Sequence, residues 1–229
     1  MSDVGLPEST AIVLLLFLIA IPIAAFVGAF LIGSIPFGYL IGRLFYHTDI
    51  RNQGSGNIGA MNALRTLGKT GAIAVLLLDV LKGFAPTLWA LVFFRDRLDM
   101  EGWPPTAQII AALVATGAVL GHCFSPWLRF KGGKGVATSF GAIFAMSWPA
   151  GLVVAGGWLA GAALTRYSSV GSMLGSALAP FAIWFFTRSL PEALYGVFSA
   201  VLILVMHREN IRRVRAGTEG PIRLSRPRA

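Results

Sequence analysis

Long apolar stretches follow one another along this chain and limit the folds open to it. An α-helix needs about 20 apolar residues to cross a bilayer. Stretches near that length occupy residues 19–45, 70–94, 105–121, 134–146, 148–164, 170–186 and 190–206. This pattern predicts an all-α fold, a polytopic membrane helix bundle with about seven transmembrane helices.

Composition agrees with a membrane location. Only 13% of the 229 residues are charged and 55% are hydrophobic, and the mean hydropathy is +0.72. Soluble domains carry about 25% charged residues, so this chain lacks the charge to cover a water-facing surface. A soluble globular enzyme, a disordered tail and a nucleic-acid module are therefore excluded, and we expect one transmembrane domain over residues 1–229 with no nucleic-acid partner.

Two of the stretches depart from the ideal length. Residues 134–146 are short for a crossing, so this segment is expected to be tilted, extended into its loops or half-inserted. The apolar run at 19–45 is over-long and contains Pro22 and Pro36. It predicts either one kinked helix or a helix preceded by an N-terminal extension over residues 1–18 that lies at the interface. The acidic start argues against a cleavable signal peptide.

Charge predicts the orientation of the bundle. With the N-terminus outside, the inside segments hold 14 Lys and Arg residues, seven of them in a basic cytoplasmic tail at 208–229. The opposite side holds only Arg95, Arg97 and Arg188. Cytoplasmic loops of membrane proteins are enriched in Lys and Arg, so we expect an outside N-terminus, a cytoplasmic C-terminus and contacts with anionic lipids.

The first polar segment, at 54–65, interleaves glycines with Ser55, Asn57, Asn62 and Arg65. It formally contains G-x-G-x-x-G, but the dinucleotide fold requires a preceding hydrophobic strand, and the chain has no parallel-sheet pattern. Glycines still let backbone amides approach an anion, and the asparagines and serine add neutral donors. The segment predicts phosphate binding, against the alternative of a flexible loop.

The second polar segment places a Gly132-Gly133 pair between Lys131 and Lys134, just before a predicted helix. Lysines and helix N-terminal amides together favour anions. A Walker P-loop is excluded because Gly135 follows Lys134 where that motif has Ser or Thr. Positive-inside anchoring would explain the lysines but not the glycines between them.

Further polar residues fall at the same membrane face or inside a span. Asp79 and Lys82 stand at i and i+3 in the second stretch, where they would form either a structural ion pair or part of a site. Near the cytoplasmic ends of other stretches lie His122, Ser169, Ser172, His207 and Asn210. With one cysteine, Cys123, and no metal-ligand cluster, we expect no metal and no cofactor; the composition is typical of a phosphate pocket.

These motifs together resemble the bacterial acyl-phosphate-dependent glycerol-3-phosphate acyltransferases. The resemblance rests on Gly54-Ser-Gly-Asn-Ile-Gly-Ala-Met-Asn with Arg65, on Lys131-Gly-Gly-Lys-Gly-Val-Ala-Thr and on His207-Arg-Glu-Asn-Ile. It extends from Gly33 to Glu219 and implies seven spans in a bacterial plasma membrane, with the active site on the cytoplasmic side. Met61 departs from the usual threonine of the first motif.

The resemblance implies transfer of a fatty acyl group from acyl-phosphate to the sn-1 hydroxyl of glycerol 3-phosphate, giving lysophosphatidic acid and phosphate. Its partners would be these two substrates, membrane lipids and the soluble enzyme that makes acyl-phosphate. The catalytic residues would be Lys134, Arg65, His207 and Ser55. Substrate-binding residues would be Asn57, Asn62, Lys82, His122, Lys131, Gly132, Gly133, Ser169, Ser172 and Asn210.

The sequence also favours direct transfer without an acyl-enzyme. The chain has no Gly-x-Ser-x-Gly nucleophile elbow, and none of its histidines is followed by the His-x-x-x-x-Asp pattern of acyl-CoA-dependent acyltransferases. The hydroxyl proton would pass to His207 or to a substrate phosphate oxygen, and we favour the latter. The alternatives are a transporter for an organic phosphate, which would predict internal repeats, and a structural scaffold, which leaves the polar clusters unexplained.

Overall fold

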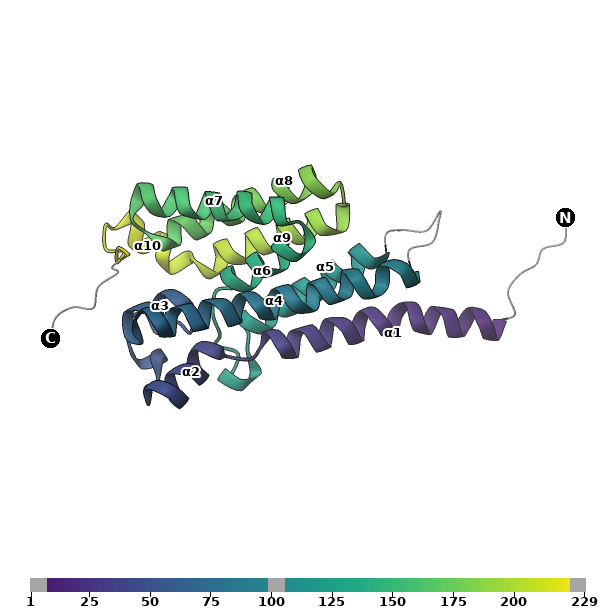
Figure 1. Cartoon of the computed structure of the whole chain (residues 1–229), viewed down its shortest axis with the longest axis horizontal. Coiled ribbons are helices and arrows are strands. Elements are labelled where there is room, and N and C mark those ends of the chain that lie inside the picture. The colour runs from purple at the N-terminus through teal and green to yellow at the C-terminus, as the bar shows by residue number, and fades with distance from the viewer. Residues whose placement is uncertain (1–7, 99–105, 223–229) are drawn as a thin grey trace.

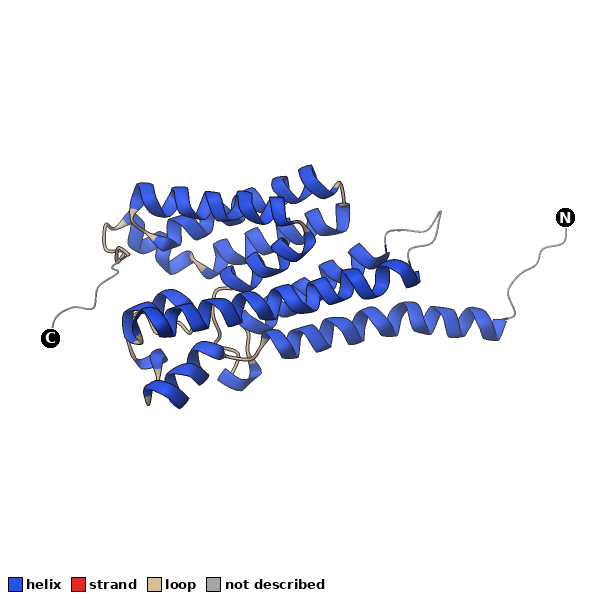
Figure 2. Ribbon diagram, in the orientation of Figure 1, coloured by secondary structure: helices blue, strands red, loops and turns tan. Residues whose placement is uncertain are grey.

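The computed structural model describes residues 8–98 and 106–222, and within these ranges the regular structure is entirely helical (Figures 1 and 2). The long helices are α1 (Glu8–Gly33), α4 (Gly68–Leu98), α5 (Thr106–Cys123), α7 (Trp148–Thr165), α8 (Ser168–Thr187) and α9 (Leu190–Met206). Shorter α-helices are α2 (Phe37–Tyr46), α3 (Ala60–Thr66), α6 (Val136–Met146) and α10 (Arg208–Arg215), with 3₁₀ turns at η1 (Ile50–Asn52) and η2 (Pro126–Leu128). The all-α prediction is confirmed.

Fewer helices can cross a membrane alone than the sequence suggested. In the described residues five helical segments are long and apolar enough, and the pair α9–α10, bent by 56°, makes a sixth. The segment predicted at 134–146 forms only the 11-residue helix α6, which is about 17 Å long against a hydrocarbon core of about 30 Å. The structure thus supports five or six spans within its described part.

The over-long first stretch is broken near its middle. Helix α1 runs continuously from Glu8 through Pro22, so residues 8–18 extend this helix, and residues 1–7 lie outside the described residues. The helix ends before Pro36, whose ring cannot continue the helical hydrogen bonds. The carbonyls freed at the break are satisfied by distant side chains: Ser125 Oγ donates to Ser34 O (2.6 Å) and Lys82 Nζ donates to Ile35 O (2.9 Å).

Two groups of helices build the molecule, with α6 between them (Figure 1). One group contains α1, α4 and α5, and the other contains α7, α8 and α9. Glycines allow the helices to approach closely: a methyl group on Gly161 would lie 2.8 Å from the Cα of Gly171, and one on Gly117 would lie 2.5 Å from Phe26 O. Because α3 and α10 occur at one end of the two groups, their polar residues are brought together there.

Candidate active site

A cavity of about 580 Å³ opens between the two helix groups at the end that carries α3 and α10. Its polar wall includes Arg65, Lys134 and Arg213, and its apolar wall comes from α6, α7 and α9. The large apolar side chains of this wall include Phe140, Ile143, Val154, Trp158 and Ile203. A single cavity therefore joins a cationic end to an apolar end.

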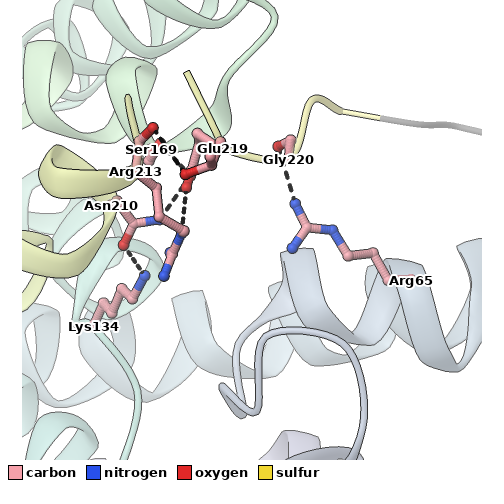
Figure 3. A network of polar contacts seen from close by, with 8 residues as sticks. Arg65, Lys134, Ser169, Asn210, Arg213, Glu219 and Gly220 are labelled. Carbon is pink, nitrogen blue, oxygen red and sulfur yellow. Dashed lines mark hydrogen bonds and ion pairs between the residues drawn. The ribbon is translucent and has the colours of Figure 1, made fainter. Parts of the chain in front are cut away.

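Lys134 supplies the most enclosed cation of this cavity. It lies in the loop just before α6, and its Nζ donates a hydrogen bond to Asn210 Oδ1 (Figure 3). Burial, together with the positive charge of Arg213 and Arg65, lowers the pKa of Lys134 to about 8, although Glu219 opposes the shift. The ammonium group thus stays protonated at neutral pH but is poorly solvated, a state that favours an anionic ligand.

Glu219 is the centre of the hydrogen-bond network behind Lys134 (Figure 3). Its Oε1 accepts from Ser169 Oγ and Asn210 Nδ2, each at 2.7 Å, and its Oε2 accepts from Arg213 Nε at 2.7 Å. Burial alone would raise the pKa of Glu219, but these three donors outweigh it and lower the pKa. The carboxylate is therefore charged, and it holds Asn210 in the orientation that receives Lys134.

The sequence did not identify Glu219 and Arg213 as site residues. The Gly217-Thr218-Glu219 motif was visible, but the basic tail around it was interpreted as a membrane-surface segment. The only sequence signal for Glu219 was a carboxylate that follows the four arginines of residues 208–215. What the sequence does not show is that the segment turns back at Gly217, whose φ is +68°, and returns over the cavity.

Arg65 approaches the cavity from the other helix group. It lies in the last turn of α3, and its Nη2 donates to the carbonyl of Gly220 (3.3 Å), so the chain after α10 bridges the two groups (Figure 3). The same segment is anchored to the group of α7, α8 and α9 by the hydrogen bond from Ile222 N to Arg166 O (2.8 Å). The structure brings Arg65 and Lys134 to one cavity, and their shared catalytic role stays a prediction.

The glycine-rich loop at 54–59 is organised by Asn62. The buried Asn62 amide donates to Ile50 O (2.7 Å) and Gln53 O (3.2 Å), and its Oδ1 accepts from Ser55 N (2.8 Å). Asn57 Oδ1 likewise accepts from Gly59 N (2.9 Å). Asn62 thus shapes the loop that exposes Ser55 to the cavity, and it lines the cavity itself; its contact with substrate stays a prediction.

The Lys131-Gly132-Gly133 segment does not form the predicted amide cradle. The amide of Gly132 donates to Cys123 O (3.0 Å) and that of Gly133 to His122 O (2.9 Å), so neither is available for an anion. Lys131 is exposed and absent from the cavity wall, unlike Lys134. The physical reason is that the segment folds back on the end of α5, which turns only Lys134 toward the cavity.

The remaining predicted residues divide between the cavity and the helix interior. Ser172, whose Oγ donates to Ser168 O (2.9 Å), lines the cavity. So does His207, whose Nδ1 lies 2.8 Å from Ile203 O; because a carbonyl only accepts, Nδ1 carries the proton. Lys82 lies outside the cavity wall and pairs with Asp79 at 2.8 Å, whereas His122 borders the cavity from α5.

Within the described residues, no group of three or more His, Cys, Asp or Glu side chains is arranged to hold a metal ion. Fold and cavity together define an integral membrane helix bundle with an end cavity that is cationic at one side and apolar at the other. Comparison with known proteins identifies the family within this class. The family model for glycerol-3-phosphate acyltransferase matches residues 23–217, and the chain belongs to this family.

Individual relatives agree over most of the chain. A glycerol-3-phosphate acyltransferase of Synechococcus sp. (strain JA-3-3Ab) is 45% identical over 195 residues, covering 85% of this chain and 90% of the relative. One of Rhodopseudomonas palustris (strain BisB5) is 44% identical over 205 residues, covering 90% and 98%.

Solved structures agree as well. The glycerol 3-phosphate form of PlsY (YgiH), an integral membrane glycerol 3-phosphate acyltransferase, superposes with a TM-score of 0.79 at 35% identity, covering 88% of this chain and 96% of that one. Its lysophosphatidic acid form gives a TM-score of 0.77 at 32% identity, covering 89% and 96%. The protein is thus a glycerol-3-phosphate acyltransferase of the PlsY type.

Proposed function

We propose that this acyltransferase takes its acyl group from a fatty acyl-phosphate and transfers it to the sn-1 hydroxyl of glycerol 3-phosphate, releasing lysophosphatidic acid and inorganic phosphate. The observation that carries the proposal is the union of cationic and apolar walls in one cavity. Both substrates bring a phosphate, and only the acyl donor brings a long apolar chain. The cavity therefore matches the two substrates at once.

The reaction is a direct transfer. The sn-1 oxygen attacks the carbonyl carbon of the acyl-phosphate, a new ester C–O bond forms, and the C–O bond to phosphate breaks. Phosphate leaves with the electron pair of that bond, and the hydroxyl proton passes to a substrate phosphate oxygen. An acyl-phosphate is already activated, so no covalent acyl-enzyme is required.

Lys134 and Arg65 neutralise the phosphates and the negative charge that develops on the carbonyl oxygen. Cations in a water-poor cavity stabilise such charge far more than they would in water. Ser55 adds a hydroxyl donor. Ser172 lines the cavity as well, and because its proton is donated to Ser168 O, it offers its hydroxyl oxygen as an acceptor. Asn210, held by Glu219, fixes the Lys134 ammonium.

His207 is assigned a supporting role. With the proton on Nδ1, held by Ile203 O, its Nε2 is an acceptor in the neutral ring and can orient a substrate hydroxyl or phosphate. The same nitrogen is the alternative acceptor for the hydroxyl proton. A substrate phosphate oxygen is favoured because it arrives with the reacting groups in every complex.

The orientation proposed is an outside N-terminus and a cytoplasmic C-terminus in the bacterial inner membrane, with the cavity on the cytoplasmic side. This rests on the positive-inside tendency: Arg95, Arg97 and Arg188 belong to the ends of α4 and α8 opposite the cavity, whereas the arginines of α10 lie beside it. Because the two termini then lie on opposite sides of the membrane, the number of crossings is odd, and α6 must count as a short seventh segment. A cytoplasmic cavity would receive acyl-phosphate from the soluble enzyme that makes it.

The test is an assay of the purified protein in detergent or bilayer discs with palmitoyl-phosphate and glycerol 3-phosphate. We expect equimolar release of phosphate and lysophosphatidic acid, and no product when palmitoyl-CoA replaces palmitoyl-phosphate. Turnover of palmitoyl-CoA at a comparable rate would refute the assignment of the donor. Transport of glycerol 3-phosphate into liposomes without acyl transfer would favour the transporter alternative.

A further inference from the structure

Three ionisable side chains are buried within the helices at the border of the cavity, and two of them, Asp79 and His122, contribute to its wall. Asp79 and Lys82 of α4 and His122 of α5 are each less than 5% exposed. Lys82 Nζ lies 2.8 Å from Asp79 Oδ1, and His122 Nδ1 lies 3.5 Å from the same oxygen. We call these three residues the Asp79 cluster. Ionisable side chains inside a membrane protein are costly, and they usually pair with one another and mark a functional part of the protein.

On one side the cluster is fixed to the break between α1 and α2. Lys82 Nζ donates to the carbonyl of Ile35 (2.9 Å) and lies 5.5 Å from the ring centre of Phe37. These contacts use the lysine fully, and its side chain lies outside the cavity wall. Lys82 therefore anchors the cluster and does not bind substrate directly.

On the other side the cluster reaches the turn that precedes Lys134. The His122 ring fills the space next to Gly133: a Cβ added to Gly133 would overlap the ring at Nε2, and its three nearest atoms all belong to that ring. Gly133 is not among the glycines with positive φ, so its backbone alone would accept alanine. The amide of Gly133 donates to His122 O (2.9 Å). Ring and turn are thus complementary in shape, one residue before Lys134.

We propose that the Asp79 cluster is a positioning device for Lys134. Asp79 orients the His122 ring, Lys82 balances the charge of Asp79 and ties it to the α1–α2 break, and the ring fixes the turn at Gly133. This inference rests on the proposed role of Lys134 in binding phosphate. Misplacing a catalytic group by about 1 Å can cost on the order of 10² in rate, so the ring can control turnover by fixing the position of Lys134.

The fit between ring and glycine gives a compensation test. Gly133→Ala and His122→Ala should each lower kcat/KM by roughly 10- to 100-fold. The double variant Gly133→Ala/His122→Ala should recover most of that loss, because the new methyl group occupies space that the ring has left. The matched control is Gly156→Ala in α7, where a methyl group meets nothing within 4 Å and activity should not change. Losses that multiply in the double variant would overturn the proposal.

A second cycle separates positioning from general destabilisation. In a Lys134→Ala background, adding His122→Ala should change kcat/KM by less than about twofold, since no lysine remains to be misplaced. Thermal unfolding of all variants is measured in parallel. If His122→Ala costs the same factor with and without Lys134, the ring does not act through the lysine and the proposal is wrong.

The charged pair is tested by neutralising both partners together, because removing one leaves an unpaired charge in the membrane interior. Asp79→Asn/Lys82→Met should lower kcat/KM as His122→Ala does, whereas Thr87→Val, a buried change on the same helix, should not. An active pair variant equal to wild type would remove Asp79 and Lys82 from the device.

A readout without acyl transfer keeps this inference distinct from the proposed function. Pulse labelling with acetic anhydride at pH 8, followed by mass spectrometry, reports the reactivity of the Lys134 amine. Gly133→Ala and His122→Ala should each change its labelling rate at least severalfold, and the double variant should restore it. If wild type fails to transfer acyl groups but this pattern holds, the proposed function is wrong and the positioning stands; unchanged labelling overturns the positioning itself.

Discussion

Replacing Lys134 by alanine tests the centre of the site. The ammonium is poorly solvated, is held by Asn210 and shares a cavity wall with Arg65 and Arg213, so two cations remain when it is removed. Loss of one charged donor to a developing anion costs about 2–4 kcal/mol, roughly 30- to 1,000-fold in rate. We expect Lys134→Ala to lower kcat/KM by that factor while the fold is retained.

The assay follows phosphate release from palmitoyl-phosphate with glycerol 3-phosphate varied, so that kcat and KM are separated. Because Lys134 is placed to bind both ground-state phosphate and the transition state, KM should rise and kcat should fall. Lys131→Ala is the matched control: Lys131 is three residues earlier, exposed and outside the cavity wall, and its loss should change kcat/KM by less than about twofold.

A folded Lys134→Ala protein with more than half of the wild-type kcat/KM would refute the placement of Lys134 at the reacting phosphates. Equal losses of kcat/KM in Lys131→Ala and Lys134→Ala would refute the conclusion that Lys134 acts in the cavity and Lys131 does not. Folding is checked by thermal unfolding and by size-exclusion chromatography in detergent.

Further predictions follow from the same geometry. Since the pKa of Lys134 is lowered to about 8, the amine loses its charge as pH rises through 8. The value of kcat/KM should then fall about tenfold per pH unit in the alkaline range. The Lys134→Arg variant should lack this alkaline decrease, because arginine stays protonated. Glu219→Ala removes the acceptor of three hydrogen bonds. It should lower the free energy of unfolding by about 1–3 kcal/mol and reduce kcat/KM, because Asn210 is no longer held. A Glu219→Ala protein as thermally stable as wild type would contradict the stabilising role of this network. Radiolabelled acyl-phosphate alone should leave no acyl group on the protein after an acid quench; a labelled serine or cysteine that chases into lysophosphatidic acid would refute direct transfer. The Cys123→Ala variant should keep wild-type activity, whereas Ser55→Ala should cost about 1–3 kcal/mol in transition-state binding.

Much of the architecture was predictable because it depends on local composition. Apolar length predicts a span wherever it occurs, so helices α4, α5, α7, α8 and α9 agree closely with the predicted stretches. The stretch at 134–146 was already short for a crossing in the sequence, and the helix that forms there, α6 (Val136–Met146), is shorter still.

The chemistry of the site was also largely present in the sequence. Lys134, Arg65, Ser55, Ser172 and His207 lie on one cavity, as predicted from glycine-rich polar segments at one membrane face. Residue type indicated the kind of ligand here, because lysine, arginine and neutral donors together favour an anion.

Only the tertiary structure decided which polar groups are available to a ligand. Asn62 and the amides of Gly132 and Gly133 look like anion ligands in the sequence, but each is already paired within the fold. Glu219 looked like part of a surface tail, and the network makes it the support of Asn210 and hence of Lys134. Such pairings join groups that are far apart in the chain, and the strength of a hydrogen bond depends on distance and angle. Sequence therefore determined the membrane bundle and the kind of site, whereas packing determined which of its polar groups face the substrate.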